Sequence, residues 1–183
     1  MTGGAPACAG ATRGTAPARL WVSGAGVRHA DGRWAPDMVD LSFDFGTINA
    51  ITGPVGCGKT SLAHLIAGLI PSHIPIDHAG SVHIVDADGT ECPVDGDRVT
   101  FVGQDPATQV LTLRVVDDVA MALEFSLVEA GIVAKRSAEA LSELGLSELA
   151  EKDPWALSGG QRQRAMIAMA LVCHPALLIA DEP

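Results

Sequence analysis

A glycine-rich segment has the residue types and the spacing that suit phosphate binding. Residues 53–60 read Gly-Pro-Val-Gly-Cys-Gly-Lys-Thr and fit the pattern G-x-x-x-x-G-K-[ST]. The glycines let consecutive backbone N–H groups curl around phosphate oxygens, and a following helix directs its positive N-terminal end to the same point. The pattern predicts a triphosphate site in which Lys59 reaches the β- and γ-phosphates and Thr60 ligates Mg²⁺. The other expected contacts are Gly53, Gly56, Cys57, Gly58 and Ser61.

A second segment has the composition of another anion site. Residues 157–161 read Leu-Ser-Gly-Gly-Gln, and residues 162–165, Arg-Gln-Arg-Ala, continue into an expected helix. A serine and two glycines at a helix N-terminus present backbone N–H groups to an anion. Ser158 is also expected to be the N-cap of this helix.

Together the two segments resemble the ABC ATPase family, whose signature motif reads LSGGQRQR. The resemblance extends over about residues 20–183. It implies that the second segment covers the γ-phosphate bound by the P-loop of another subunit, so that two ATP molecules lie in a head-to-tail dimer. The residues that it assigns to the nucleotide of the other subunit are Ser158, Gly159, Gly160 and Gln161.

Two further segments resemble motifs of the same family. An apolar run ends at Asp181 and Glu182, as in a Walker B motif. This implies that Asp181 holds Mg²⁺ and that Glu182 polarises the attacking water. Residues 101–106, Phe-Val-Gly-Gln-Asp-Pro, resemble the Q-loop, in which Gln104 senses Mg²⁺ and the γ-phosphate. Catalysis is thereby assigned to Glu182, Gln104 and Lys59.

The residue that contacts adenine is harder to assign, because the family usually stacks an aromatic ring on the base and this chain has no tyrosine. Residues 27–32 resemble the loop that carries this ring, with His29 in the aromatic position. Imidazole can stack, although it offers less area than tyrosine. Trp34 and Trp21 are competing candidates, and a surface histidine without a ligand is the alternative for His29.

The pattern of apolar residues predicts an α/β fold, with a P-loop NTPase core around a mostly parallel sheet. Residues 41–45 alternate as a strand, 47–52 form a second apolar segment, and a helix with Leu62, Leu65, Ile66 and Leu69 on one face ends at Pro71. Residues 72–98 are expected to form a small antiparallel β subdomain, and about 116–158 a helical insert. Residues 1–18 are expected to be a flexible tail before a single domain at 19–183.

Composition narrows the class of partner. The formal net charge is −10, and an acidic chain repels phosphate backbones, so we expect no nucleic acid partner.

The four cysteines are far apart, which favours reduced, cytoplasmic thiols. Neither a transmembrane helix nor a signal peptide is predicted. The expected location is the cytoplasmic face of the cell membrane.

The resemblance implies an ATPase that drives a membrane transporter together with a second ATP-binding subunit and integral membrane subunits. Residues 68–75 and 104–109 resemble the energy-coupling-factor branch, which takes up vitamins and cobalt or nickel ions. The sequence leaves open the substrate and whether the dimer is homomeric. A soluble ABC-type ATPase of DNA repair or translation is the alternative. The family continues beyond Walker B with a D-loop and a switch histidine, so the chain is expected to be C-terminally incomplete and inactive alone.

Overall fold

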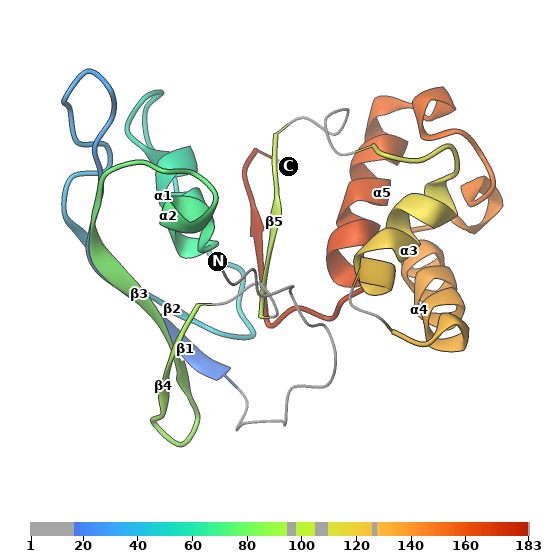
Figure 1. Ribbon diagram of the computed structural model, residues 1–183, viewed down its shortest axis with the longest axis horizontal. Coiled ribbons are helices and arrows are strands. Elements are labelled where there is room, and N and C mark those ends of the chain that lie inside the picture. The colour runs from blue at the N-terminus through green and yellow to red at the C-terminus, as the bar shows by residue number, and fades with distance from the viewer. Residues whose placement is uncertain (1–16, 95–97, 105–109, 126–127, 183) are drawn as a thin grey trace, which may run out of the picture. The chain divides into compact units, whose positions relative to one another are not determined.

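The computed structural model describes residues 17–94, 98–104, 110–125 and 128–182. Two compact units divide between Phe101 and Val102, where the sequence led us to expect one domain. Each unit has its own helices and strands (Figure 1).

The N-terminal unit is built on a four-stranded sheet in the order β2-β1-β3-β4. The strands are β1 at Pro17–Val27, β2 at Val39–Asp44, β3 at His78–Asp86 and β4 at Glu91–Pro93. All three pairings are antiparallel. This sheet therefore contains the antiparallel subdomain expected from residues 72–98, enlarged by β1 and β2.

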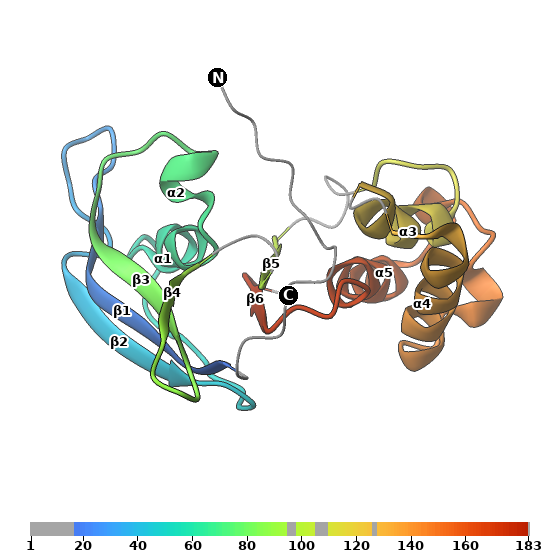
Figure 2. The ribbon, with the colours of Figure 1, turned by 60° about the horizontal axis from the view of Figure 1, so that its bottom comes forward.

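Helices α1, Lys59–Ile66, and α2, Leu69–Ser72, cover one face of this sheet (Figure 2). Leu62, Leu65 and Ile66 of α1 are buried, as the helical spacing predicts. The core of the unit also contains Leu20, Val22, Ala25 and Val27 of β1 and Ile84 of β3. The buried apolar side chains of α1 thereby fix this helix against the sheet. The glycine-rich segment at residues 53–60, which we call the P-loop, leads into its N-terminus.

Three features of this unit differ from the sequence-based expectation. Strand β1 begins at Pro17, inside the expected tail, and its central role was not predicted. Residues 47–52 lie outside the strands, and Ile48 is fully exposed. Helix α1 ends at Ile66 and not at Pro71, because Gly68 adopts a left-handed backbone with φ 71° that interrupts the helix.

The C-terminal unit contains the helical insert. Its helices are α3 at Val115–Phe125, α4 at Ala130–Glu143 and α5 at Gly159–Leu171, with short 3₁₀ turns η2 at Ser147–Leu149 and η3 at Pro154–Ala156 (Figure 1). These elements agree with the insert predicted for about 116–158. One apolar cluster joins the three helices; it includes Val119, Leu123, Val133, Leu141, Leu146, Leu157, Ala168 and Val172.

Helix α4 ends in a hydrogen-bonded turn at Gly145. Gly145 has φ 66°, its N–H donates to Ser142 O at 3.1 Å, and Leu146 N–H donates to Leu141 O at 2.8 Å. This is the Schellman arrangement, in which a left-handed glycine satisfies the last helical carbonyls.

Two further strands are β5, Val99–Val102, and β6, Leu177–Ala180. In the C-terminal unit, the N–H of Asp181 donates to the carbonyl of Val102 at 2.9 Å. This bond fixes the end of β6, after which Asp181 and Glu182 follow.

Candidate functional site

The P-loop leads into a helix whose N-terminus is open. Gly58 is the N-cap of α1 with φ 95°, no side chain caps this end, and the first turn contains no acidic residue. The N–H groups at the start of a helix lack intrahelical partners and carry the positive end of the helix dipole. An incoming anion is therefore the natural partner of the first turn, which includes Lys59, Thr60 and Ser61.

Lys59 closes the loop on itself. Its ammonium donates to Gly53 O at 3.0 Å and to Pro54 O at 3.1 Å. Because a lysine ammonium has three N–H groups, these two bonds leave one for an acceptor outside the loop. Lys59 is thus positioned at the mouth of the loop with hydrogen-bonding capacity for a phosphate oxygen.

Two glycines of the loop lie at close approaches, and at Gly58 the neighbouring atoms are backbone and leave no room for a side chain. A Cβ on Gly53 would lie 2.8 Å from Cys57 Sγ, so the half-buried thiol is turned into the loop against Gly53. A Cβ on Gly58 would lie 2.2 Å from the backbone nitrogen of Pro36. The P-loop is therefore packed from within by Cys57 and from outside by the chain segment at Pro36.

That segment belongs to a hairpin, residues 28–36, which we call the base hairpin. It contains the Arg28–Trp34 bridge and a bond from His29 N–H to Arg33 O at 2.9 Å. The Nε2 atom of His29 lies 3.0 Å from Ala35 O and 3.3 Å from the hydroxyl oxygen of Ser61. Since a carbonyl only accepts, Nε2 donates to Ala35 O. His29 therefore contacts the first turn of α1.

The competing tryptophans lie in different surroundings. A Cβ on Gly26 would lie 3.0 Å from the ring of Trp34. This ring therefore packs against β1. Trp21 is 44% exposed on β1, with the guanidinium of Arg19 5.7 Å from its ring centroid. Of the three aromatic candidates, His29 is the one for which the structure records a contact with the P-loop helix.

The signature segment forms a reciprocal cap at the start of α5. Ser158 N–H donates to the Gln161 side-chain oxygen at 3.0 Å, and Gln161 N–H donates to the Ser158 hydroxyl at 3.3 Å. This capping box confirms Ser158 as the N-cap. Among the described residues, no atom beyond their chain neighbours and the backbone of α5 lies within 4 Å of the Cβ positions of Gly159 and Gly160, so this part of the backbone borders open space.

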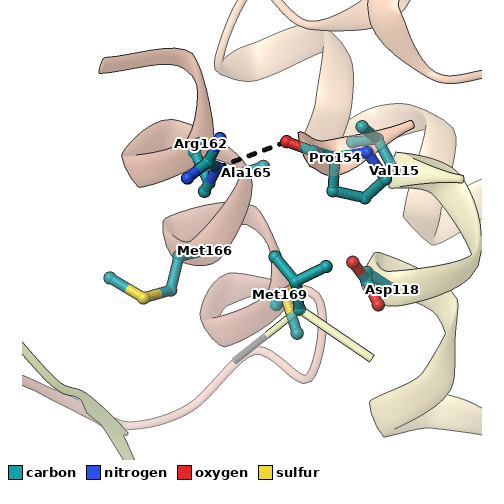
Figure 3. A pocket seen from close by; sticks show the side chains of 8 residues that line it. Val115, Asp118, Pro154, Arg162, Ala165, Met166 and Met169 are labelled. Carbon is teal, nitrogen blue, oxygen red and sulfur yellow. Dashed lines mark hydrogen bonds between the residues drawn. The ribbon is translucent and has the colours of Figure 1, made fainter. Parts of the chain in front are cut away.

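Two arginines of the signature segment, to which the sequence assigned no role, hold it in place. Arg162 donates to the carbonyls of Pro154, Trp155 and Leu157 at 3.2–3.3 Å, and its guanidinium lies 5.2 Å from the Trp155 ring centroid. Figure 3 shows its bond to Pro154. Arg164 donates to Leu144 O at 3.0 Å. These contacts join α5 to η3 and to the end of α4.

Asp118 is a third positioning residue that the sequence did not reveal. It is 4% exposed and its Oδ1 accepts from the N–H groups of Leu111 and Thr112 at 3.1 and 2.8 Å. It lines a small pocket with Arg162, Met166 and Met169 (Figure 3). The pocket volume of 10 Å³ matches one water molecule, so it is too small for a nucleotide.

The Walker B residues differ in exposure. Asp181 is 7% exposed, while Glu182 is exposed and has φ 50°. A left-handed backbone at a residue other than glycine is uncommon, and such strain is frequent at functional sites. Gln104 follows β5 and is exposed. The rest of the expected Q-loop, residues 105–109, lies outside the described residues.

The comparisons with known proteins agree on one family. The family model described as ABC transporter matches residues 37–183. The chain is 40% identical over 169 residues to the energy-coupling factor transporter ATP-binding protein EcfA1 of Symbiobacterium thermophilum, covering 86% of this chain and 56% of the relative. It is 37% identical over 152 residues to the spermidine/putrescine import ATP-binding protein PotA of Salmonella typhimurium, covering 83% and 39%.

A solved structure gives the same result. The chain is similar to cbiO1 from Clostridium perfringens, described as part of the ABC transporter complex cbiONQ, with a TM-score of 0.75 and 27% identity over 91% of this chain and 66% of that chain. This match confirms the α/β fold of a P-loop ATPase. The chain spans less than two thirds of the length of each of these three proteins.

Within the residues that the structure describes, no helix has both the length and the apolar character needed to cross a membrane.

Proposed function

The chain belongs to the ABC transporter family, and we propose that it is an ATP-binding subunit that hydrolyses Mg-ATP to drive transport through membrane partner subunits. The observation that carries the proposal is the open N-terminus of α1, which has no side-chain cap and no acid, behind a glycine loop closed by Lys59. This arrangement is suited to a polyphosphate.

In this proposal the triphosphate lies on the P-loop. The backbone N–H groups of Gly56 and of residues 58–61 donate to its oxygens, and Lys59 offers its remaining N–H to the β- and γ-phosphates. Gly53 and Cys57 keep the loop closed from within. His29, held beside Ser61, is the residue proposed to stack on adenine.

Hydrolysis requires an oxygen-rich site for Mg²⁺ and a carboxylate for the attacking water. The hydroxyl of Thr60, the carboxylate of Asp181 and the side-chain oxygen of Gln104 are the hard oxygen donors that Mg²⁺ prefers. When bound, the ion neutralises charge on the phosphate oxygens. Glu182 orients the water and accepts its proton as the water oxygen attacks phosphorus in line with the leaving ADP.

The signature segment is proposed to serve a second ATP-binding subunit. The start of α5 offers the N–H groups of Gly159 and Gly160 beside open space, while Ser158 and Gln161 hold the helix end in shape. In a two-fold dimer, each subunit would present this end to the γ-phosphate of the other.

The transported substrate is proposed to be a vitamin or a transition-metal ion. Support comes from the 40% identity to an energy-coupling factor ATPase and from the similarity to cbiO1. The chain would then act at the cytoplasmic face of the membrane, passing its movement through the helical insert and Gln104. A soluble ABC-type ATPase of DNA repair or translation is the alternative, and the net charge of −10 disfavours it.

The test is to isolate the tagged protein from membranes of its own cells and to identify what copurifies. The proposal predicts a second ATP-binding subunit and integral membrane proteins, and ATP-dependent uptake of a labelled vitamin, cobalt or nickel that stops when the gene is deleted. Recovery with ribosomes or DNA and without membrane proteins would contradict it.

A further inference from the structure

Arg33 is a cation of the base hairpin that lies next to the P-loop. Its Nη2 is 4.0 Å from the point that a Cβ on Gly56 would occupy. Gly56 has φ 79°, and apart from Gly56 and its two chain neighbours no other atom of the described residues lies within 4 Å of that point. The guanidinium therefore borders the loop where its backbone is open.

The base hairpin fixes this position from two sides. The backbone at Ala35 and Pro36 packs against Gly58, and His29 contacts Ser61 at 3.3 Å. At the tip, the side chain of Asp31 accepts from Arg33 N–H at 3.0 Å. Because the hairpin is anchored at Gly58 and Ser61, the fold holds the backbone of Arg33 beside the P-loop, and its exposed side chain reaches Gly56 from there.

The charges around Arg33 favour an external anion. Its recorded ion pair is with Asp31 at 3.9 Å, and both side chains are more than 60% exposed. An exposed pair at this distance contributes little, so the fork of N–H donors remains able to bind a stronger acceptor. Lys59, in contrast, uses two of its three N–H groups in hydrogen bonds to Gly53 O and Pro54 O.

We propose that Arg33 is a phosphate-binding residue of this site, whose guanidinium donates to the polyphosphate of a nucleoside di- or triphosphate lying on Gly56. The assignment rests on the proposed function, because it requires a nucleotide on the P-loop. A planar fork of donors suits a phosphate better than a single ammonium does. Arg33 thus favours nucleotides with a β-phosphate over monophosphates.

The experiment is to measure binding of Mg-ATP and Mg-ADP by calorimetry, and of AMP by competition, in wild type and in Arg33→Ala, Arg33→Gln, Arg33→Lys and Asp31→Asn. We expect Arg33→Ala and Arg33→Gln to weaken Mg-ATP and Mg-ADP by about tenfold and AMP by less than about twofold. Arg33→Lys should restore part of the loss. Asp31→Asn, which keeps an oxygen for Arg33 N–H but removes the competing charge, should strengthen Mg-ATP binding by about twofold.

Two results would overturn the assignment. One is Mg-ATP affinity in both neutral variants equal to that of wild type. The other is an equal loss for ATP, ADP and AMP, which would mean that Arg33 acts through the shape of the base hairpin. A wild-type protein that binds no Mg-ATP would instead refute the proposed function itself, so the two failures are distinguishable.

Discussion

At the scale of single residues, Glu182 combines exposure with an unusual backbone. It follows the buried Asp181 and has φ 50°. A non-glycine residue in the left-handed region costs on the order of 1 kcal/mol, and it persists where the surrounding structure determines it. Its exposure leaves the carboxylate accessible to a water molecule.

Glu182→Gln should retain Mg-ATP binding and lose ATP turnover in the assembled transporter by about a hundredfold or more, because the amide cannot accept the proton of the attacking water. The measurement is steady-state phosphate release beside equilibrium ATP binding. Glu148→Gln, an exposed acid of η2, is the control and should leave both unchanged. Turnover at the wild-type rate in Glu182→Gln would show that another group is the base.

Cys57 offers a chemical probe of the P-loop, since its sulfur lies in the loop against Gly53. Mg-ATP should slow maleimide labelling of Cys57, because a filled loop cannot open to admit the reagent, and prior labelling should block ATP binding. Cys92 of β4, also half-buried, is the internal control. The rates are followed by mass spectrometry. Equal labelling of Cys57 with and without Mg-ATP would place the nucleotide elsewhere.

Much of the candidate site could be predicted at this scale, because the chemistry depends on residue types at fixed spacing. The P-loop pattern predicts Lys59 and Thr60 as site residues, and the family resemblance implies Asp181 and Glu182; these assignments stay predictions. Arg162 and Asp118 escaped prediction for a shared reason. Their partners are backbone groups of other segments, and which carbonyl or N–H lies beside a side chain is decided only when the chain folds.

At the scale of elements, the start of α5 separates a structural role from a binding role. Ser158 and Gln161 cap the helix reciprocally, while Gly159 and Gly160 face open space. The first pair explains why the helix begins here, and the second explains how an anion could approach. A substitution that keeps the cap but changes the charge can distinguish the two roles.

Gln161→Glu is that substitution, because glutamate also completes a capping box. The melting temperature should stay equal or rise slightly, since a carboxylate interacts favourably with a helix N-terminus. ATPase activity of the assembled protein should fall by about tenfold or more, because the same charge repels a phosphate. Ser158→Ala is the companion and should lower stability by about 1 kcal/mol. Full activity in Gln161→Glu would argue that no anion approaches α5.

Asp118 holds the segment that enters α3, and its removal should be costly. Asp118→Ala leaves the N–H groups of Leu111 and Thr112 without their acceptor and should destabilise the protein by about 2 kcal/mol. Asp118→Asn keeps one side-chain oxygen. Because a single oxygen, Oδ1, accepts both bonds in the wild type, this variant should lose less than about 1 kcal/mol of the free energy of unfolding. Urea unfolding measures both. Equal losses in the two variants would indicate that charge, not the acceptor, matters.

Element boundaries were less predictable than element types. The helical insert followed from the sequence pattern. Strand β1 was missed because its alternation is short, with Leu20 and Val22 buried around the exposed Trp21, and two glycines interrupt it. The end of α1 was placed too late because Gly68 stops the helix before Pro71 does.

At the scale of the whole molecule, the sequence bears an excess of acidic charge, 22 acidic against 12 basic residues. Cations near the P-loop, Lys59 and Arg33, therefore act within a field that repels anions. We infer that nucleotide affinity depends on these local donors and on Mg²⁺, and not on the general charge of the protein. This makes the P-loop the decisive element of the account.

The most direct test of the central claim is calorimetric titration of the purified protein with Mg-ATP, in wild type and in Lys59→Ala. Wild type should bind, and Lys59→Ala should lose about tenfold or more in affinity, because the loop loses both its cation and its two closing hydrogen bonds. Lys135→Ala, an exposed lysine of α4, controls for net charge and should bind as wild type does. Equal affinity for Mg-ATP in wild type and Lys59→Ala would contradict the account.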